Sequence, residues 1–129
     1  MKNDLIMKKN SFLILVILFI TGCKSAKSIT NTTTMDIRSL HAVEKDVSTN
    51  LLFSTQENKV VALQILKGKQ LKEHITKVPA LLVCVTGEAI YADEKGQSFN
   101  LKSGSYVTIE PNVKHWVDAV ETSNLLLIK

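Results

Sequence analysis

Beyond residue 50 the apolar and polar positions of the chain alternate with a period of two, in short runs divided by turn residues. Side chains of a strand point alternately to its two faces, so this period is typical of strands with one buried face. The turn signals recur about every eight to twelve residues, which favours an antiparallel sandwich or barrel. The predicted strands occupy residues 50–54, 59–66, 70–75, 80–86, 88–92, 97–101, 105–109, 113–120 and 124–129.

A different period precedes the strands. Ile37, Leu40, Val43 and Val47 are spaced by three, three and four residues, and Asp36 stands where a helix cap would. This spacing predicts a short helix over residues 36–47. A first strand of the barrel that uses some of the same residues is the alternative.

The N-terminal segment has the features of an export signal. Lys8 and Lys9 give it a positive start, and residues 11–20 form an apolar run too short for a permanent membrane span. The run ends in residues 20–23, Ile-Thr-Gly-Cys, which resembles the bacterial lipobox, where cleavage precedes a lipidated cysteine. We therefore expect a lipoprotein signal peptide over residues 1–22 and lipid on Cys23; an uncleaved short anchor is the alternative.

The expected address is the cell envelope, on the periplasmic side of the outer membrane if the cell is Gram-negative. Translation could start at Met1 or at Met7, because the positive segment follows both. Residues 23–35 are mostly small, polar or basic and are expected to form a flexible tether to a single domain over residues 36–129. Acyl chains on Cys23 would make the membrane a partner.

Composition limits the remaining part to one domain of ordinary charge. The whole chain has a net charge of +4, but the 107 residues after position 22 hold 13 basic and 11 acidic residues, a net charge of +2. No basic run is interleaved with aromatic residues, so nucleic acid is not an expected partner. Cys84 would be the only remaining thiol if Cys23 is lipidated; we expect it to be a small buried hydrophobe, with no disulfide.

Two blocks of residues resemble the motifs of the cupin family. The first motif, G-x5-H-x-H-x3-E-x6-G, resembles Gly68, five residues, His74, Ile75, Thr76, three residues, Ala80, six residues and Gly87. The second, G-x5-P-x-G-x2-H, resembles Gly104, five residues, Glu110, Pro111, Asn112, two residues and His115. The resemblance implies an all-β fold, a double-stranded β-helix or jelly-roll barrel.

The motif glycines are expected at strand junctions. Gly68, Gly87 and Gly104 stand where a positive φ or a close backbone approach is needed. Asn112 replaces the glycine of the second motif, and asparagine enters left-handed conformations more readily than most residues.

In cupins the motifs supply a divalent metal with three histidines and a glutamate. The resemblance places His74, Thr76, Ala80 and His115 at those positions, so only His74 and His115 can act as ligands. We expect a weak or vacant metal site and no other cofactor, because catalytic sites usually supply three protein ligands. The alternative is that both histidines are interior polar residues, hydrogen-bonded to each other, to Thr76 or to water.

The barrel register also predicts a pocket. Its expected lining is mainly apolar: His74, Thr76, Ala80, Leu82, Cys84, His115 and Val117. Such a cavity suits a small ligand with an apolar body and one or two hydrogen-bonding groups. The family resemblance further implies a homodimer formed through the outer sheet.

Three functions follow, with no residue assigned as catalytic. The favoured one is an envelope-anchored cupin that binds or senses a small ligand without catalysis. A metal-dependent enzyme of the dioxygenase or isomerase type, using His74 and His115, is the first alternative, and a structural dimerisation module is the second.

Overall fold

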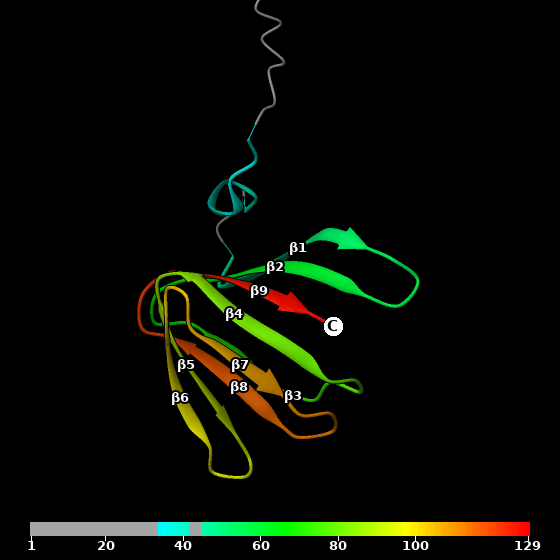
Figure 1. The fold of residues 1–129 in the computed structure, drawn as a ribbon. Coiled ribbons are helices and arrows are strands. Elements are labelled where there is room, and N and C mark those ends of the chain that lie inside the picture. The colour runs from blue at the N-terminus through cyan, green and yellow to red at the C-terminus, as the bar shows by residue number, and fades with distance from the viewer. Residues whose placement is uncertain (1–33, 42–44) are drawn as a thin grey trace, which may run out of the picture. The chain divides into compact units, whose positions relative to one another are not determined.

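The computed structural model describes residues 34–41 and 45–129, which contain one short 3-10 helix and nine strands in two antiparallel sheets (Figure 1). The five-stranded sheet has the order β1 (Val47–Ser54), β2 (Lys59–Ile65), β9 (Ser123–Ile128), β4 (Ala80–Thr86) and β7 (Tyr106–Ile109). The four-stranded sheet has the order β3 (Gln70–His74), β8 (His115–Ala119), β5 (Glu88–Asp93) and β6 (Ser98–Lys102). These sheets confirm the predicted all-β, jelly-roll architecture.

The inner faces of the two sheets meet in one apolar core. Both sheets contribute to it, because inward and outward side chains alternate along each strand. In the row that crosses the first sheet, Leu63 pairs with Leu125, and Leu125 pairs with Cys84. The buried cluster comprises Leu63, Ile65, Ala80, Leu82, Cys84, Ala89, Tyr91, Leu101, Val107, Ile109, Val117, Ala119 and Leu125.

The predicted helix was too long. Among the described residues of this segment the helical part is the 3-10 helix η1 (Ile37–Ser39), which Asp36 caps by accepting a hydrogen bond from the Arg38 N–H at 2.9 Å. Strand β1 already begins at Val47, as the alternative interpretation of this segment allowed. The apolar spacing persisted for too few residues to outweigh the pairing of Val47 with Ile65 in β2. The predicted residue Val43 lies outside the described residues.

The turns between the strands follow the expected backbone conformations. Gly68, Gly87, Gly104 and Asn112 all have positive φ, which confirms that prediction. Gly87 is the most constrained glycine, because a Cβ built there would lie 2.3 Å from the Thr122 carbonyl oxygen. Only glycine fits between β4 and β5 at this point.

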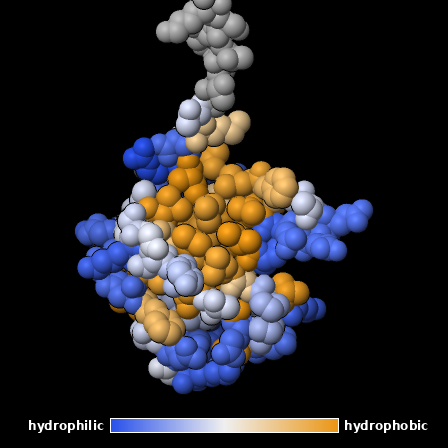
Figure 2. Space-filling model, in the orientation of Figure 1, coloured by the Kyte–Doolittle hydropathy of each residue, from blue (hydrophilic) through white to orange (hydrophobic). Residues whose placement is uncertain are grey.

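The outer face of the five-stranded sheet is also apolar. The register places Ala62, Leu126 and Val83 side by side in one row across β2, β9 and β4. Val60, Ile128 and Leu81 form the next row on the same face. Figure 2 shows hydrophobic surface over these strands. We call these six residues the outer apolar face.

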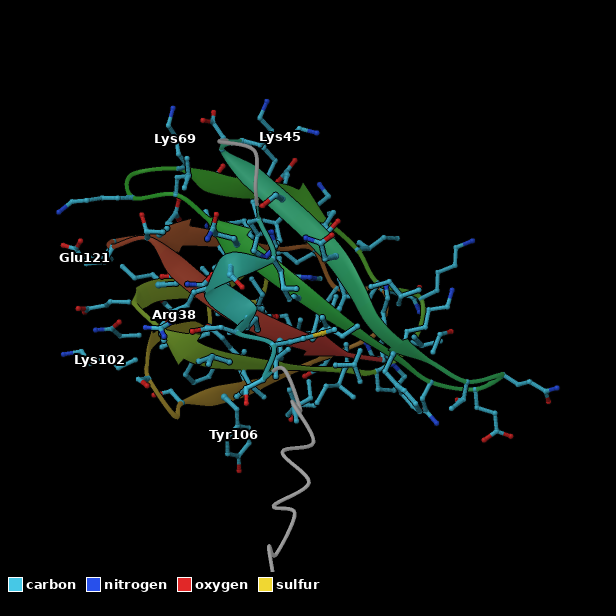
Figure 3. All side chains as sticks on the ribbon, turned by 90° about the horizontal axis from the view of Figure 1, so that it is seen from above. Arg38, Lys45, Lys69, Lys102, Tyr106 and Glu121 are labelled. Atoms are coloured by element: carbon cyan, nitrogen blue, oxygen red, sulfur yellow. The ribbon has the colours of Figure 1, made fainter. Side chains whose placement is uncertain are left out.

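Two features border this face. The Asn50 side chain donates a hydrogen bond to the Leu40 carbonyl at 2.8 Å, which holds the segment after η1 against β1. Tyr106, at the start of β7, is 68% exposed and points away from the sheet (Figure 3). The helix η1 is too short to cross a membrane, and the described residues contain no longer apolar helix.

Candidate functional site

The two motif histidines are neighbours in the four-stranded sheet. His74 ends β3 and His115 begins β8, and the two are Cα partners in the pairing of these strands. Their ring centroids are 4.3 Å apart, with the ring planes tilted by 58°. A register irregularity between Leu71 and His74 brings His74 opposite His115. The fold therefore joins residues from the two sequence motifs.

Backbone carbonyls fix the protonated nitrogen of each neutral ring. His74 Nδ1 lies 2.8 Å from the Lys72 carbonyl oxygen, and His115 Nδ1 lies 3.0 Å from the Val113 carbonyl oxygen. A carbonyl oxygen can only accept, so each Nδ1 donates, and in the neutral form of either ring Nε2 then carries the lone pair. His115 Nε2 is buried and has no partner among the described residues.

The environment of His115 favours a neutral ring. His115 is 1% exposed, and its ring stacks on Tyr91 with centroids 5.7 Å apart. Burial lowers the pKa of His115, and the neighbouring His74 lowers it further, whereas the Val113 carbonyl and Asp93 act in the opposite direction. A neutral imidazole with a free Nε2 can accept a hydrogen bond or bind a metal.

The other two metal positions of the motif offer no comparable ligand. Thr76 is buried, and its Oγ1 has no hydrogen-bond partner in the described part of the chain. Ala80 belongs to the apolar core. No group of three or more histidine, cysteine or acidic side chains in residues 34–41 and 45–129 is arranged to hold a metal ion. Two imidazoles alone do not fit a tightly bound catalytic metal.

Three further residues predicted to line a cavity are packed in the core. Leu82 is 2% exposed, Val117 is 1% exposed and Cys84 has no exposed surface. Burial also raises the pKa of the Cys84 thiol, which keeps it protonated and poorly nucleophilic. These side chains fill the barrel between the two sheets.

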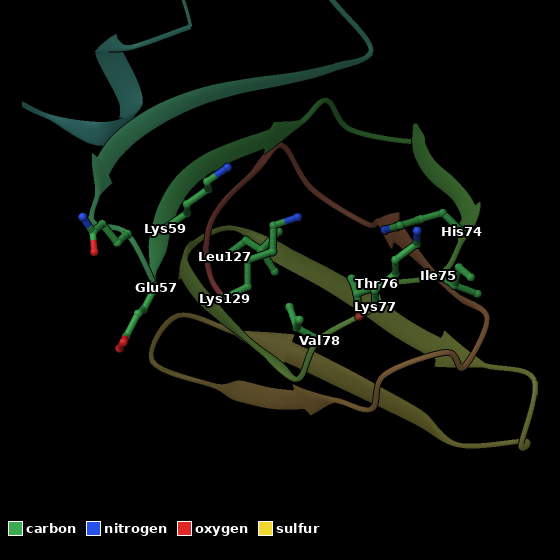
Figure 4. Close-up of a pocket in the computed structure, with 10 residues that line it drawn as sticks. Glu57, Lys59, His74, Ile75, Thr76, Lys77, Val78, Leu127 and Lys129 are labelled. Carbon is green, nitrogen blue, oxygen red and sulfur yellow. The ribbon is translucent and has the colours of Figure 1, made fainter.

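A pocket of about 450 Å³ lies at the end of the strands where His74 is found. Figure 4 shows Lys59, Leu127 and Lys129 on one side of it and His74, Ile75 and Thr76 on the other. Its lining comprises Gln56, Glu57, Lys59, His74, Ile75, Thr76, Lys77, Val78, Leu127 and Lys129. His74 and Thr76 are the two predicted pocket residues in this lining.

The remaining lining residues were not predicted from the sequence. Lys59 and Lys129 are neighbours because β2 pairs with β9. These strands are far apart in the chain, and the alternation of apolar and polar residues within a strand does not predict which strands pair. Ile75 and Val78 gave one usable signal, because both are large apolar residues: Ile75 ends the predicted strand 70–75, and Val78 lies in the loop before the predicted strand 80–86. In the structure Ile75 is 49% exposed and Val78 is 50% exposed.

Comparisons with known proteins place the fold. No protein-family model matches the sequence, and no curated protein matches it. Solved structures do match. A cupin superfamily protein from Desulfitobacterium hafniense superposes with a TM-score of 0.65 at 16% identity, over 72% of this chain and 84% of that chain.

Two further structures agree with this match. A conserved protein of unknown function from Streptococcus pyogenes gives a TM-score of 0.64 at 18% identity, over 75% of this chain and 85% of that one. A cupin-2 domain containing protein from Shewanella frigidimarina gives 0.59 at 15% identity, over 67% and 83%. At these identities the likeness shows that the chain has the cupin fold.

Proposed function

We propose that this cupin-fold domain binds a small molecule in the pocket beside His74 and Thr76, without catalysing a reaction on it. The proposal rests on two buried polar atoms that have no hydrogen-bond partner among the described residues, Thr76 Oγ1 and His115 Nε2; a third such atom, His41 Nε2, belongs to a residue outside the pocket lining. Buried polar atoms are nearly always hydrogen-bonded, so unsatisfied ones point to a bound group or water. Thr76 lines the pocket, and the His115 ring contacts His74, which also lines it.

The size and lining of the pocket support this proposal. A volume of about 450 Å³ is within the range of small-molecule sites. Ile75, Val78 and Leu127 offer apolar contacts, and His74 offers a hydrogen-bonding nitrogen. A ligand with an apolar body and one polar group would use both parts.

Phenol, which has this composition, is a suitable first probe. We expect phenol to change the backbone amide NMR signals of residues 74–78 in the full chain held in non-ionic detergent. Val78→Trp should abolish these changes by filling the pocket, whereas Val120→Trp, at another exposed valine outside the lining, should keep them. Changes that persist in Val78→Trp, or that occur only elsewhere, would overturn the proposal.

A metal-dependent enzyme is the second candidate, favoured by the adjacent rings of His74 and His115. Both rings keep an Nε2 lone pair in their neutral form, but two ligands predict weak binding. We expect well under one equivalent of divalent metal in the chain purified without chelator. A full equivalent that is lost in His74→Ala or His115→Ala would favour the enzyme.

We also propose that the domain is held at the cell envelope by lipid on Cys23. Both Cys23 and the signal-like segment before it lie outside the described residues, so the sequence alone supports this step. Cys23→Ser should release the protein from the membrane fraction. A variant that stays in the membrane with unchanged electrophoretic mobility would contradict lipidation.

The outer apolar face supports a homodimer, the partner implied by the family resemblance. Leu81, Val83, Leu126 and Ile128 are only partly buried in the single chain. Burying such a face against a second copy removes apolar surface from water. Leu126→Lys should give monomers in sedimentation experiments, and a monomeric wild-type chain would contradict the dimer.

A further inference from the structure

The pocket carries an excess of positive charge. Three of its ten lining residues are lysines, Lys59, Lys77 and Lys129, and one is acidic, Glu57, so the lining side chains have a net charge of +2. The other described residues, eight basic and nine acidic, have a net charge of −1. The positive charge of the domain is therefore concentrated at this pocket.

The lysines of the pocket also differ from most other basic residues in their ion pairing. Outside the pocket, five basic residues form ion pairs with carboxylates: Arg38, Lys67, Lys69, Lys95 and Lys102. None of the three pocket lysines has an ion-pair partner within residues 34–41 and 45–129. Their ammonium groups are available to an anion from solution.

Two of these lysines are forced together by the sheet. Lys59 and Lys129 face each other across β2 and the end of β9, and the Lys129 N–H donates to the Lys59 carbonyl at 3.0 Å. The Lys59 N–H donates to the Lys129 carbonyl in return. Side chains of such a pair are close neighbours on one face, and like charges there are destabilising. An anion between the two ammonium groups would relieve this repulsion.

The rest of the lining limits the kind of anion. Ile75 and Val78 line the pocket and are about half exposed to solvent, and Leu127 adds a third apolar side chain. Thr76, 7% exposed, has a hydroxyl without a partner in the described chain. An inorganic anion would leave the apolar wall in contact with water. An organic anion would cover the wall and meet the lysines together.

We infer that the pocket binds a small organic carboxylate, with its charged group at Lys59, Lys77 and Lys129 and its apolar body against Ile75, Val78 and Leu127. This inference rests on the proposal that the pocket binds a small molecule, and it specifies the chemical class. Lysine suits this role because its ammonium group is a compact charge on a flexible stem.

Benzoate, benzamide and inorganic phosphate separate the contributions of charge and apolar body. Benzoate and benzamide share a ring and differ in charge, while phosphate has charge without a ring. In the full chain at low ionic strength, we expect benzoate to bind on the order of tenfold more tightly than benzamide or phosphate. The measurement is the shift of amide NMR signals of residues 74–78 with concentration.

Substitutions of the pocket lysines test whether they bind the carboxylate group. Lys59→Met together with Lys77→Met should weaken benzoate binding on the order of tenfold and leave benzamide binding unchanged. Lys114→Met, at an exposed lysine outside the pocket lining and without an ion pair among the described residues, should change neither. Lys59→Met alone should also raise the melting temperature of the ligand-free protein, because it removes the like-charged pair.

Each contrary result has a distinct meaning. Equal affinity for benzoate and benzamide, or benzoate binding that survives loss of both lysines, would overturn the carboxylate inference and leave phenol binding intact. Phosphate binding as tight as benzoate would overturn the organic class in favour of an inorganic anion. Failure of benzoate to bind at all would also overturn the inference, and loss of phenol binding in addition would remove the pocket proposal beneath it.

Discussion

Strands β2, β4 and β9 run from one end of the barrel to the other, and their two ends differ in how polar groups are satisfied. At the end near Gly87, the buried Asn124 side chain donates to Thr86 Oγ1 at 2.9 Å and accepts from Gln64 Nε2 at 3.0 Å. The buried Ser123 hydroxyl lies 2.9 Å from the Glu88 carbonyl oxygen. We call this the closed end.

The opposite end of the same strands carries the pocket, and we call it the open end. Here Thr76 Oγ1 is buried without a partner in the described chain, and Lys59 faces Lys129. Val78 leaves half of its apolar surface in water. None of these three features stabilises the fold of the ligand-free protein. A ligand could hydrogen-bond to the hydroxyl, offset the like charges and cover the apolar surface. The barrel thus separates the residues that stabilise it from those that we propose bind a ligand.

The largest expected effect contrasts the middle of the barrel with the open end. Leu82→Asp places a carboxylate in the core without a partner and should lower the free energy of unfolding by about 4 kcal/mol or prevent folding. Val78→Asp, at a half-exposed position, should cost less than about 1 kcal/mol. Urea denaturation of both variants measures the difference, and similar losses would show that Val78 is also part of the folding core.

Gly87 at the closed end gives the next largest effect. Gly87→Ala forces a Cβ against the Thr122 carbonyl at a residue with φ of +92° and should cost about 3 kcal/mol. Gly96 also has a positive φ, +84°, but a Cβ there would meet no neighbouring atom of the described residues within 4 Å, so Gly96→Ala is expected to cost about 1 kcal/mol. Thermal melts that rank the two variants in the opposite order would contradict tight packing at the closed end.

The smallest effects should have opposite signs at the two ends. Thr76→Val removes a buried hydroxyl that has no partner among the described residues and should stabilise the ligand-free protein by about 1 kcal/mol. Ser123→Ala removes a hydroxyl that has carbonyl partners and should destabilise it by about 1 kcal/mol. Chemical denaturation of both decides the question, and a destabilised Thr76→Val would show that this hydroxyl supports the fold.

The fold could be predicted because its signal is local. Alternation along each strand placed all nine strands close to their observed bounds, and the positive φ of Asn112 followed from its position in the second motif. The one error of type, the helix over residues 36–47, arose where the apolar spacing is short and β1 competes for Val47.

The site was predictable only in part, for a physical reason. Motif spacing named His74 and Thr76, and both line the pocket. Alternation also identified Leu82 and Val117 as inward-facing, but it does not tell which part of an interior is filled and which is left open. Lys59 and Lys129 become neighbours through pairing of distant strands, which no period in the sequence encodes.

The place of β9 in the first sheet has a consequence for the order of events during synthesis. Figure 1 shows β9 between β2 and β4, so the centre of that sheet is supplied by residues 123–128. Strands β2 and β4 cannot complete their pairing until this segment has left the ribosome, and such long-range β contacts form slowly. The five-stranded sheet of a nascent chain therefore stays incomplete until residues 123–128 have been synthesised. If the domain is exported to the envelope, as proposed above, this delay would keep the chain incompletely folded and able to pass through an export channel.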